Sequence, residues 1–227
     1  MNEIGLGAHS MPTKPRRADE RANFISATGA LRRLAIANFS TKMARLDALM
    51  EQCNGNTHVK TLNMWRERGY DANFIQDLTR GKGEAKARTA IELIEFLSEG
   101  SPPIRLACQE VLDCKVIEPL DKSRYRSHQK LIIAEKIPGN AFYLAQSLRA
   151  LLIDARVMHA GLTNKAKSDM VALFNDPNST FKVLIMMFDV GAVGLNLHVA
   201  CNHVTILSLA KNRAQELQVS GRPFRVG

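Results

Sequence analysis

Two arginines near the end of the chain have the type and spacing to bind phosphate. In Gln218-Val-Ser-Gly221-Arg222-Pro-Phe-Arg225 they lie three residues apart, which on a helical turn places them on one face. Guanidinium groups form charge-assisted bonds to phosphate, and such a pair suits the charge spread over a triphosphate during phosphoryl transfer. Because Gly221 has no side chain, the backbone at this position can pass close to a neighbouring group. The alternative is a pair of surface arginines on a basic face.

The chain lacks the loop that usually holds the phosphates of a bound nucleotide. No segment reads Gly-x-x-x-x-Gly-Lys followed by Ser or Thr, the spacing at which backbone N–H groups cradle phosphate. We therefore expect the sequence to hold the arginine half of a split ATP site.

A glycine-rich loop follows a long apolar run. Gly191-Ala-Val-Gly194-Leu-Asn196 comes directly after Lys182 to Phe188. Glycines after a strand allow backbone N–H groups to approach a phosphate, although many ordinary loops are rich in glycine.

A second turn has the features of a phosphate-binding helix start. In His159-Ala-Gly161-Leu-Thr163, the hydroxyl of Thr163, the nearby Lys165 and the first N–H groups of the next helix could hold a nucleic-acid phosphate. The alternatives are that Thr163 only caps that helix and that His159 packs inside the turn.

The elements that must position these residues alternate between strand and helix. Short apolar runs predict strands at 130–134, 155–158, 182–188 and 203–207, and helical spacing predicts helices at 141–152, from 163 and from 212. Thr163 is expected to cap its helix, and Asp176-Pro-Asn-Ser to form a turn. Such alternation predicts an α/β fold, an open parallel sheet flanked by helices over about residues 125–227.

The first half of the chain reads differently. Residues 1–22 lack apolar periodicity and predict a disordered tail. Residues 23–122 predict a helical linker-like region, with an apolar stripe at 90–97 and a further helix starting near Pro103. Residues 123–227 form the third expected unit, the sheet-containing lobe.

Charge and cysteine content narrow the class of protein. The net charge is +9, and residues 123–227 carry 13 Lys and Arg against 6 Asp and Glu, so nucleic acid is the expected partner rather than a membrane. The four cysteines fit no zinc spacing and are expected to be reduced and mostly buried. No metal site, signal peptide or membrane span is expected.

Four segments in the right order resemble the second RecA-like lobe of Swi/Snf-type superfamily-2 DNA-dependent ATPases. They are Lys130 to Ala134, Ala155 to Thr163, Val183 to Leu197, and Gln218 to Gly227. The resemblance extends from about Ser101 to the end of the chain. Two departures stand out: Met187-Phe188 replaces the family's Ser-Thr, and Ala192 replaces a second glycine.

The resemblance implies roles for individual residues. Arg222, Arg225 and Gln218 would be catalytic, and Gly191, Gly194, Asn196 and Gly221 would contact ATP. His159, Gly161, Thr163 and Lys165 would contact nucleic acid. ATP with Mg²⁺ would be bound mainly by a first RecA-like lobe, in cis or in trans, which is missing here. Met187 and Phe188 put a hydroxyl contact to DNA phosphate in doubt.

These implications predict the C-terminal half of an ATP-dependent DNA translocase or chromatin-remodelling ATPase, inactive alone. The alternative is a non-catalytic module that binds nucleic acid or a partner, and a lobe of an RNA helicase ranks third. We expect duplex DNA as partner and an intracellular, nuclear location. Because the family usually continues beyond Arg225-Val-Gly227, the chain resembles a fragment with one exposed sheet edge.

Overall fold

Four parallel strands form the centre of the protein. A computed structural model of the chain describes residues 31, 34–44, 76–77, 79–113, 130–191, 195–197, 201 and 203–221. Within them, the sheet has the strand order β2-β3-β1-β4. The strands are β1 (Leu131–Glu135), β2 (Asp154–Met158), β3 (Phe181–Met187) and β4 (Val204–Ile206). The predicted open parallel α/β fold is therefore confirmed.

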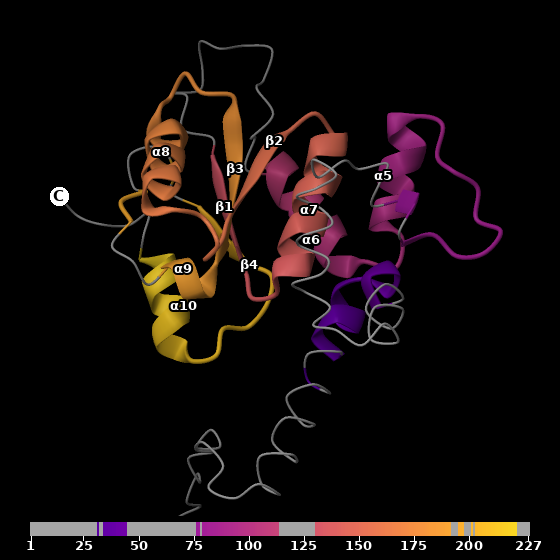
Figure 1. The fold of residues 1–227 in the computed structure, drawn as a ribbon, viewed down its shortest axis with the longest axis horizontal. Helices are drawn as coiled ribbons and strands as arrows, with labels where there is room; N and C mark the ends of the chain where they lie inside the picture. Colours follow the sequence, from indigo (N-terminus) through magenta and orange to yellow (C-terminus); the bar gives the residue numbers. More distant parts are fainter. Residues whose placement is uncertain are drawn as a thin grey trace, which may run out of the picture.

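Helices cover both faces of this sheet (Figure 1). On one side lie α8 (Asn164–Asn175), the short α9 (Phe188–Gly191) and α10 (Arg213–Ser220). On the other side lies α7 (Pro138–Ala150), with α5 (Ala90–Ser98) and α6 (Pro102–Asp113) packed outside it.

The strands are apolar because both of their faces are buried. In β1, Leu131 and Ile133 point into the core on the α7 side, and Ile132 and Ala134 into the core on the α8 side. Side chains alternate between the two faces of a strand, so a strand covered on both sides needs apolar residues at every position. This explains why the strands read as continuous runs in the sequence.

The helical region before the sheet is built into the same core. Helix α5 begins with a capping box in which Thr89 Oγ1 accepts from the backbone N–H of Glu92, and the Glu92 carboxylate accepts from the N–H of Thr89. Leu97 of α5 and Ile104 of α6 are fully buried in the core cluster that also contains residues of β1 and β3.

Helix α6 also reaches the edge of the sheet. The carboxylate of Glu110 pairs with His203 Nε2 at 3.0 Å and accepts from Thr205 Oγ1 at 3.2 Å. Thr205 belongs to β4, more than ninety positions further along the chain. The predicted boundary at residues 122–123 lies outside the described residues, as do the predicted tail and the last residues of the chain.

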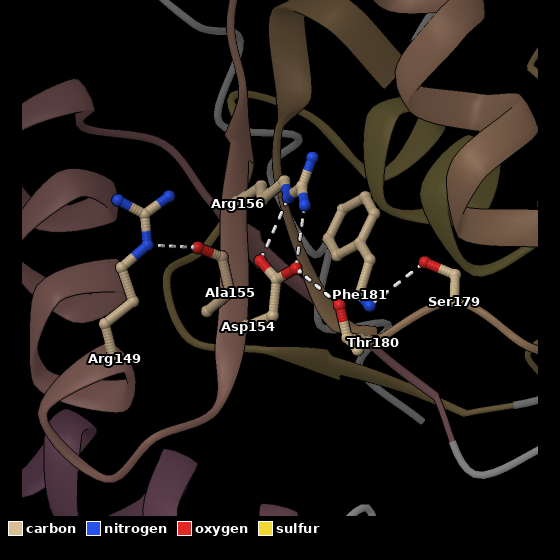
Figure 2. A network of polar contacts seen from close by, with 7 residues as sticks. All are labelled: Arg149, Asp154, Ala155, Arg156, Ser179, Thr180 and Phe181. Atoms are coloured by element: carbon tan, nitrogen blue, oxygen red, sulfur yellow. Dashed lines mark hydrogen bonds and ion pairs between the residues drawn. The ribbon is translucent and has the colours of Figure 1, made fainter.

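Strand β2 is one edge of the sheet, and charged side chains hold its start (Figure 2). Arg149 Nε donates to the carbonyl of Ala155 at 2.8 Å. Arg156 forms a bidentate pair with Asp154 at 2.8 and 2.9 Å, and its guanidinium lies 4.9 Å from the Phe181 ring centroid. An occupied edge carbonyl and edge charges disfavour pairing with another chain.

The predicted strands and helices are present, but some of them begin or end at other residues than predicted. Strand β3 ends at Met187, because Phe188 begins α9. Lys130 precedes β1 instead of starting it, and α6 begins at Pro102. In α10, Leu217 is 61% exposed, and the buried apolar residue is Val219.

Candidate functional site

The candidate site lies at the edge of the sheet where all four strands end. Because the strands are parallel, their carboxyl ends meet at one edge, which is where α/β sheets bind ligands. The turn from 159 to 163 follows β2, α9 follows β3, and the loop from 207 to 212 leads from β4 into α10. Apart from Asn196, which lies beyond α9, the predicted site residues within the described part of the chain belong to these segments or to the helices that they start.

Helix α10 carries the start of the arginine motif. Asn212 caps the helix by accepting from the N–H of Gln215 at 3.0 Å, and Gly221 ends it with its N–H bonded to the carbonyl of Leu217 at 2.9 Å. Gln218 is exposed, whereas its neighbour Val219 is buried. The motif thus has its amide in solvent at the end of an anchored helix.

Arg222 and Arg225 follow this helix but lie outside the described residues, as does Gly194. Their predicted roles stay predictions. Gly191 is the last residue of α9, and Asn196 is exposed, with its carbonyl accepting from Asn175 Nδ2 at 2.8 Å.

The two residues that depart from the expected Ser-Thr are part of the core. Met187 is 6% exposed and Phe188 is 3% exposed, and both belong to the cluster on the α8 side of the sheet. Neither offers a hydroxyl or any other polar group to a ligand.

The turn after β2 combines a buried histidine with an exposed helix start. His159 is 6% exposed, and its ring meets Phe142 edge to face at 5.3 Å between centroids. Thr163 caps α8 by accepting from the N–H of Ala166 at 3.2 Å, as predicted. Gly161 and Lys165 are exposed. His159 packs inside the turn, and the exposed residues are the ones open to a ligand.

A buried carboxylate, which the sequence analysis missed, ties two of these segments together. Glu135 ends β1 and is fully buried. Its Oε1 accepts from the N–H groups of Lys136 and Ile137, both at 2.9 Å, and from Ser208 Oγ at 3.0 Å. Ser208 in turn accepts from the N–H of Lys136 at 2.9 Å. Its position directly after an apolar strand was a signal available in the sequence.

Burial also changes the acidity of this group. Desolvation raises the pKa of Glu135 above its ordinary value, and the hydrogen bonds from Ile137, Ser208 and Lys136, with a weaker contact from the Asn140 side chain, oppose that rise. Within the described residues, its second oxygen, Oε2, and the nearby Asn140 Oδ1 have no partner at hydrogen-bond distance.

A second, exposed contact fixes the same loop to α9. Lys211 Nζ lies 3.2 Å from Asp189 Oδ1, and the N–H of Ala210 donates to Glu216 Oε1 at 3.2 Å. An exposed ion pair contributes little energy by itself. Together with the bonds at Glu135, however, it holds the loop before α10 at both ends.

The predicted nucleotide and phosphate contacts differ in what they leave open to a ligand. Gln218 is an exposed amide at the sheet edge, and the N–H groups of Gly221 and Ala166 are already bonded within their own helices. Across the part of the chain that the structure describes, His, Cys, Asp and Glu side chains form no group of three or more that could hold a metal ion. No helix of this part is long and apolar enough to cross a bilayer.

Comparisons with known proteins show the family and the fold of the chain. Residues 113–227, slightly more than half of the chain, match the family described as the helicase conserved C-terminal domain. Transcription termination factor 2 of Drosophila melanogaster is 41% identical over 63 residues, which are 28% of this chain and 6% of that protein. The chain therefore covers only a small part of this relative.

A solved structure shares the fold. The C-terminal part of the Fun30 ATPase domain superposes with a TM-score of 0.54, covering 94% of this chain and 69% of that one. The two sequences are 18% identical, so this likeness concerns the fold alone.

Proposed function

The chain belongs to the helicase conserved C-terminal domain family, and on this premise we propose that it is a lobe of the Swi/Snf type that works as half of an ATP-dependent DNA translocase. Its partners would be duplex DNA and a first RecA-like lobe, in cis or in trans. Its location would be nuclear, and its process the remodelling of chromatin.

One observation carries this proposal. Helix α10, anchored at the carboxyl edge of the sheet, brings Gln218 into solvent and ends at Gly221, immediately before Arg222. A side chain that acts on a nucleotide held by another lobe needs this kind of exposed position on a fixed element. The bonds at Glu135 and Lys211 supply the fixed element.

The proposed chemistry is stabilisation of charge on a phosphoryl group in transfer. Bound ATP, with Mg²⁺ held mainly by the other lobe, would supply the phosphoanhydride bond that is broken. Arg222 and Arg225 would neutralise the charge that develops, a contribution worth ~10³–10⁵ in rate for arginine fingers. Gln218 would orient the γ-phosphate or the attacking water.

The turn after β2 would form part of the DNA track. Gly161 and Lys165 are exposed there, and the Thr163 hydroxyl can still donate its proton to a phosphate while it caps α8. Contacts of this kind position a protein on the DNA backbone and carry no sequence preference.

The test is the DNA-stimulated ATPase activity of the chain, alone and mixed with a matching first lobe. We expect no turnover from the chain alone and activity from the mixture. Arg225→Ala should lower kcat of the mixture by ~10³ or more, whereas Arg213→Ala, an exposed arginine of α10 outside the motif, should not. If the chain alone showed turnover that depends on Arg225, the proposal that the ATP site is divided between two lobes would be wrong. If the mixture stayed active with Arg225→Ala, the proposal that Arg225 is an arginine finger would be wrong.

Burial of Met187 and Phe188 favours a second candidate function, a non-catalytic module that binds nucleic acid. Such a module would bind duplex DNA with an affinity that falls steeply with salt, because binding releases counterions from phosphate. DNA binding without activity in the mixture would select this candidate. Competition between duplex DNA and duplex RNA for binding distinguishes these two candidates from a lobe of an RNA helicase.

A further inference from the structure

A groove beside α5 has the features of a binding site that is independent of the sheet edge. It has a volume of about 680 Å³ and is lined by α5, by the segment before it and by Arg105 of α6. In Figure 1, α5 lies on the opposite side of the molecule from α8 and α10. Its lining includes Gln76, Lys86, Arg88, Glu95, Phe96 and Arg105.

A buried amide without partners faces this groove. Gln76 is fully buried, yet neither its Nε2 nor its Oε1 has a hydrogen-bond partner among the residues that the structure describes. Buried polar groups in folded proteins are almost always bonded, so an orphaned one requires an explanation. An amide that must both donate and accept is complementary to a peptide group, which does the same.

Some of the charged side chains that line the groove have partners among the described residues of the protein, and others do not. The Glu92 carboxylate accepts from the N–H groups of Arg88 and Thr89, which together lower its pKa, and Glu99 pairs with Lys42 Nζ at 2.8 Å. By contrast, the structure gives the guanidinium groups of Arg88 and Arg105 no carboxylate partner within the described residues.

We propose that the α5 groove binds an extended peptide segment of a partner protein that carries an acidic side chain. The peptide backbone would pair with the Gln76 amide, which has to turn out of its buried position to reach it. Its carboxylate would bind Arg88 and Arg105, whose planar groups match a carboxylate. A nucleotide fits less well, because its phosphates would bring several negative charges beside Glu92, Glu95 and Glu99.

The test measures peptide binding to the whole chain by calorimetry. The probe is an acetylated and amidated peptide of alternating alanine and glutamate, and the control peptide has lysine in place of glutamate. We expect the glutamate peptide to bind and the lysine peptide not to. Arg105→Gln should weaken binding about tenfold or more, whereas Arg213→Gln, which removes an exposed charge from α10, should leave it unchanged.

Gln76→Leu separates a binding role from a structural one. It should weaken peptide binding and yet leave the chain at least as stable, because it removes a buried amide that has no partner. Unchanged peptide binding by this variant would overturn the proposal, as would a loss of stability. Equal binding of the two peptides, no binding of either, or displacement of the glutamate peptide by AMP would overturn it as well.

Discussion

Glu135 is a carboxylate in a place that water does not reach. It is fully buried at the end of β1, and among the described residues one of its oxygens accepts three hydrogen bonds while the other accepts none. The bonds favour the charged form, whereas desolvation favours the neutral form and prevails, so the pKa is raised. The group holds the loop before α10 at a cost that depends on pH.

That cost predicts a pH dependence of stability. Above pH 4.5 the unfolded chain loses the Glu135 proton while the folded chain keeps it, so the free energy of unfolding falls as pH rises towards the folded pKa. Each unit of pKa difference corresponds to about 1.4 kcal/mol. Glu135→Gln keeps an acceptor for the three donors and adds a donor beside Asn140 Oδ1, so it should remove this fall and be more stable near neutral pH.

Urea unfolding of both proteins from pH 4 to pH 8 measures the effect. The matched control is Asp169→Asn, which neutralises an exposed carboxylate of α8 and should keep the wild-type slope. If Glu135→Gln unfolds more easily than the wild type at pH 7, the charged carboxylate is the stabilising form and our account of this residue is wrong.

Leu152 is a leucine in a backbone conformation that favours glycine. Its φ is 61°, and it follows α7 in a Schellman arrangement, with its N–H bonded to Arg149 O and that of Ile153 to Leu148 O. Its side chain is 95% exposed, so it gains nothing from packing. Leu152→Gly should therefore raise stability by about 0.5–1 kcal/mol, the relief of strain exceeding the entropy cost of glycine.

Thermal unfolding checks this prediction against a matched substitution. Leu209 is 79% exposed and does not have a positive φ. Leu209→Gly should lower stability by about 0.5–1 kcal/mol. If the two substitutions shift Tm in the same direction, backbone strain at Leu152 is not the cause.

At the scale of elements, helix α8 is closed by a buried lysine from another segment. Lys130 Nζ donates to the carbonyls of Phe174 and Asp176, both at 2.6 Å, where the negative end of the helix dipole lies. Lys130→Met should leave both carbonyls without this partner and cost ~1–3 kcal/mol, whereas Lys136→Met, at an exposed position, should cost little.

Lys130→Met should also change how the stability of the protein depends on pH in alkaline solution. Desolvation lowers the pKa of Lys130 to about 8 from 10.5. Between these values the unfolded chain binds a proton that the folded chain has lost, so stability rises with pH in this window. Urea unfolding from pH 7 to pH 11 should show this rise for the wild type and not for Lys130→Met. If stability still rose with pH in Lys130→Met, another titratable group would be the cause.

Elements whose cause is local could be predicted from the sequence. The run from Lys182 to Phe188 predicted β3, since a strand buried on both faces needs apolar residues throughout. Thr163 and Asn212 predicted the starts of α8 and α10, because a cap depends on residues only two or three positions away. The end of β3 was wrongly predicted at Phe188. This residue is apolar because it packs in the core, although it belongs to α9 and not to the strand.

Contacts between distant segments could not be predicted in this way. The bond between Glu135 and Ser208 joins residues 73 positions apart, and neither residue type announces its partner. The same holds for Gln76, a polar residue whose complete burial no local pattern indicates. Hydrophobic periodicity reports which face of an element is covered, but not which element covers it.

For the whole molecule, the helical region and the sheet share one hydrophobic core. Ile104 of α6 is fully buried in the cluster that contains Ile133 of β1 and Ile185 of β3. Packing of this extent predicts that both parts unfold in one cooperative transition. Ile104→Ala should therefore cost ~2–5 kcal/mol and lower the protection of the β1 and β3 amides together with that of α6.

Hydrogen exchange of the whole chain, read amide by amide, measures this coupling. The matched control is Leu106→Ala in the same helix, where the side chain is 47% exposed and less packing is lost, so the cost should stay below about 1 kcal/mol. If Ile104→Ala weakens protection in α5 and α6 while the β1 and β3 amides exchange as in the wild type, the helical region is a separate unit. In that case the sheet would hold the loop before α10 without help from α6, and the contact of Glu110 with β4 would contribute little to its position.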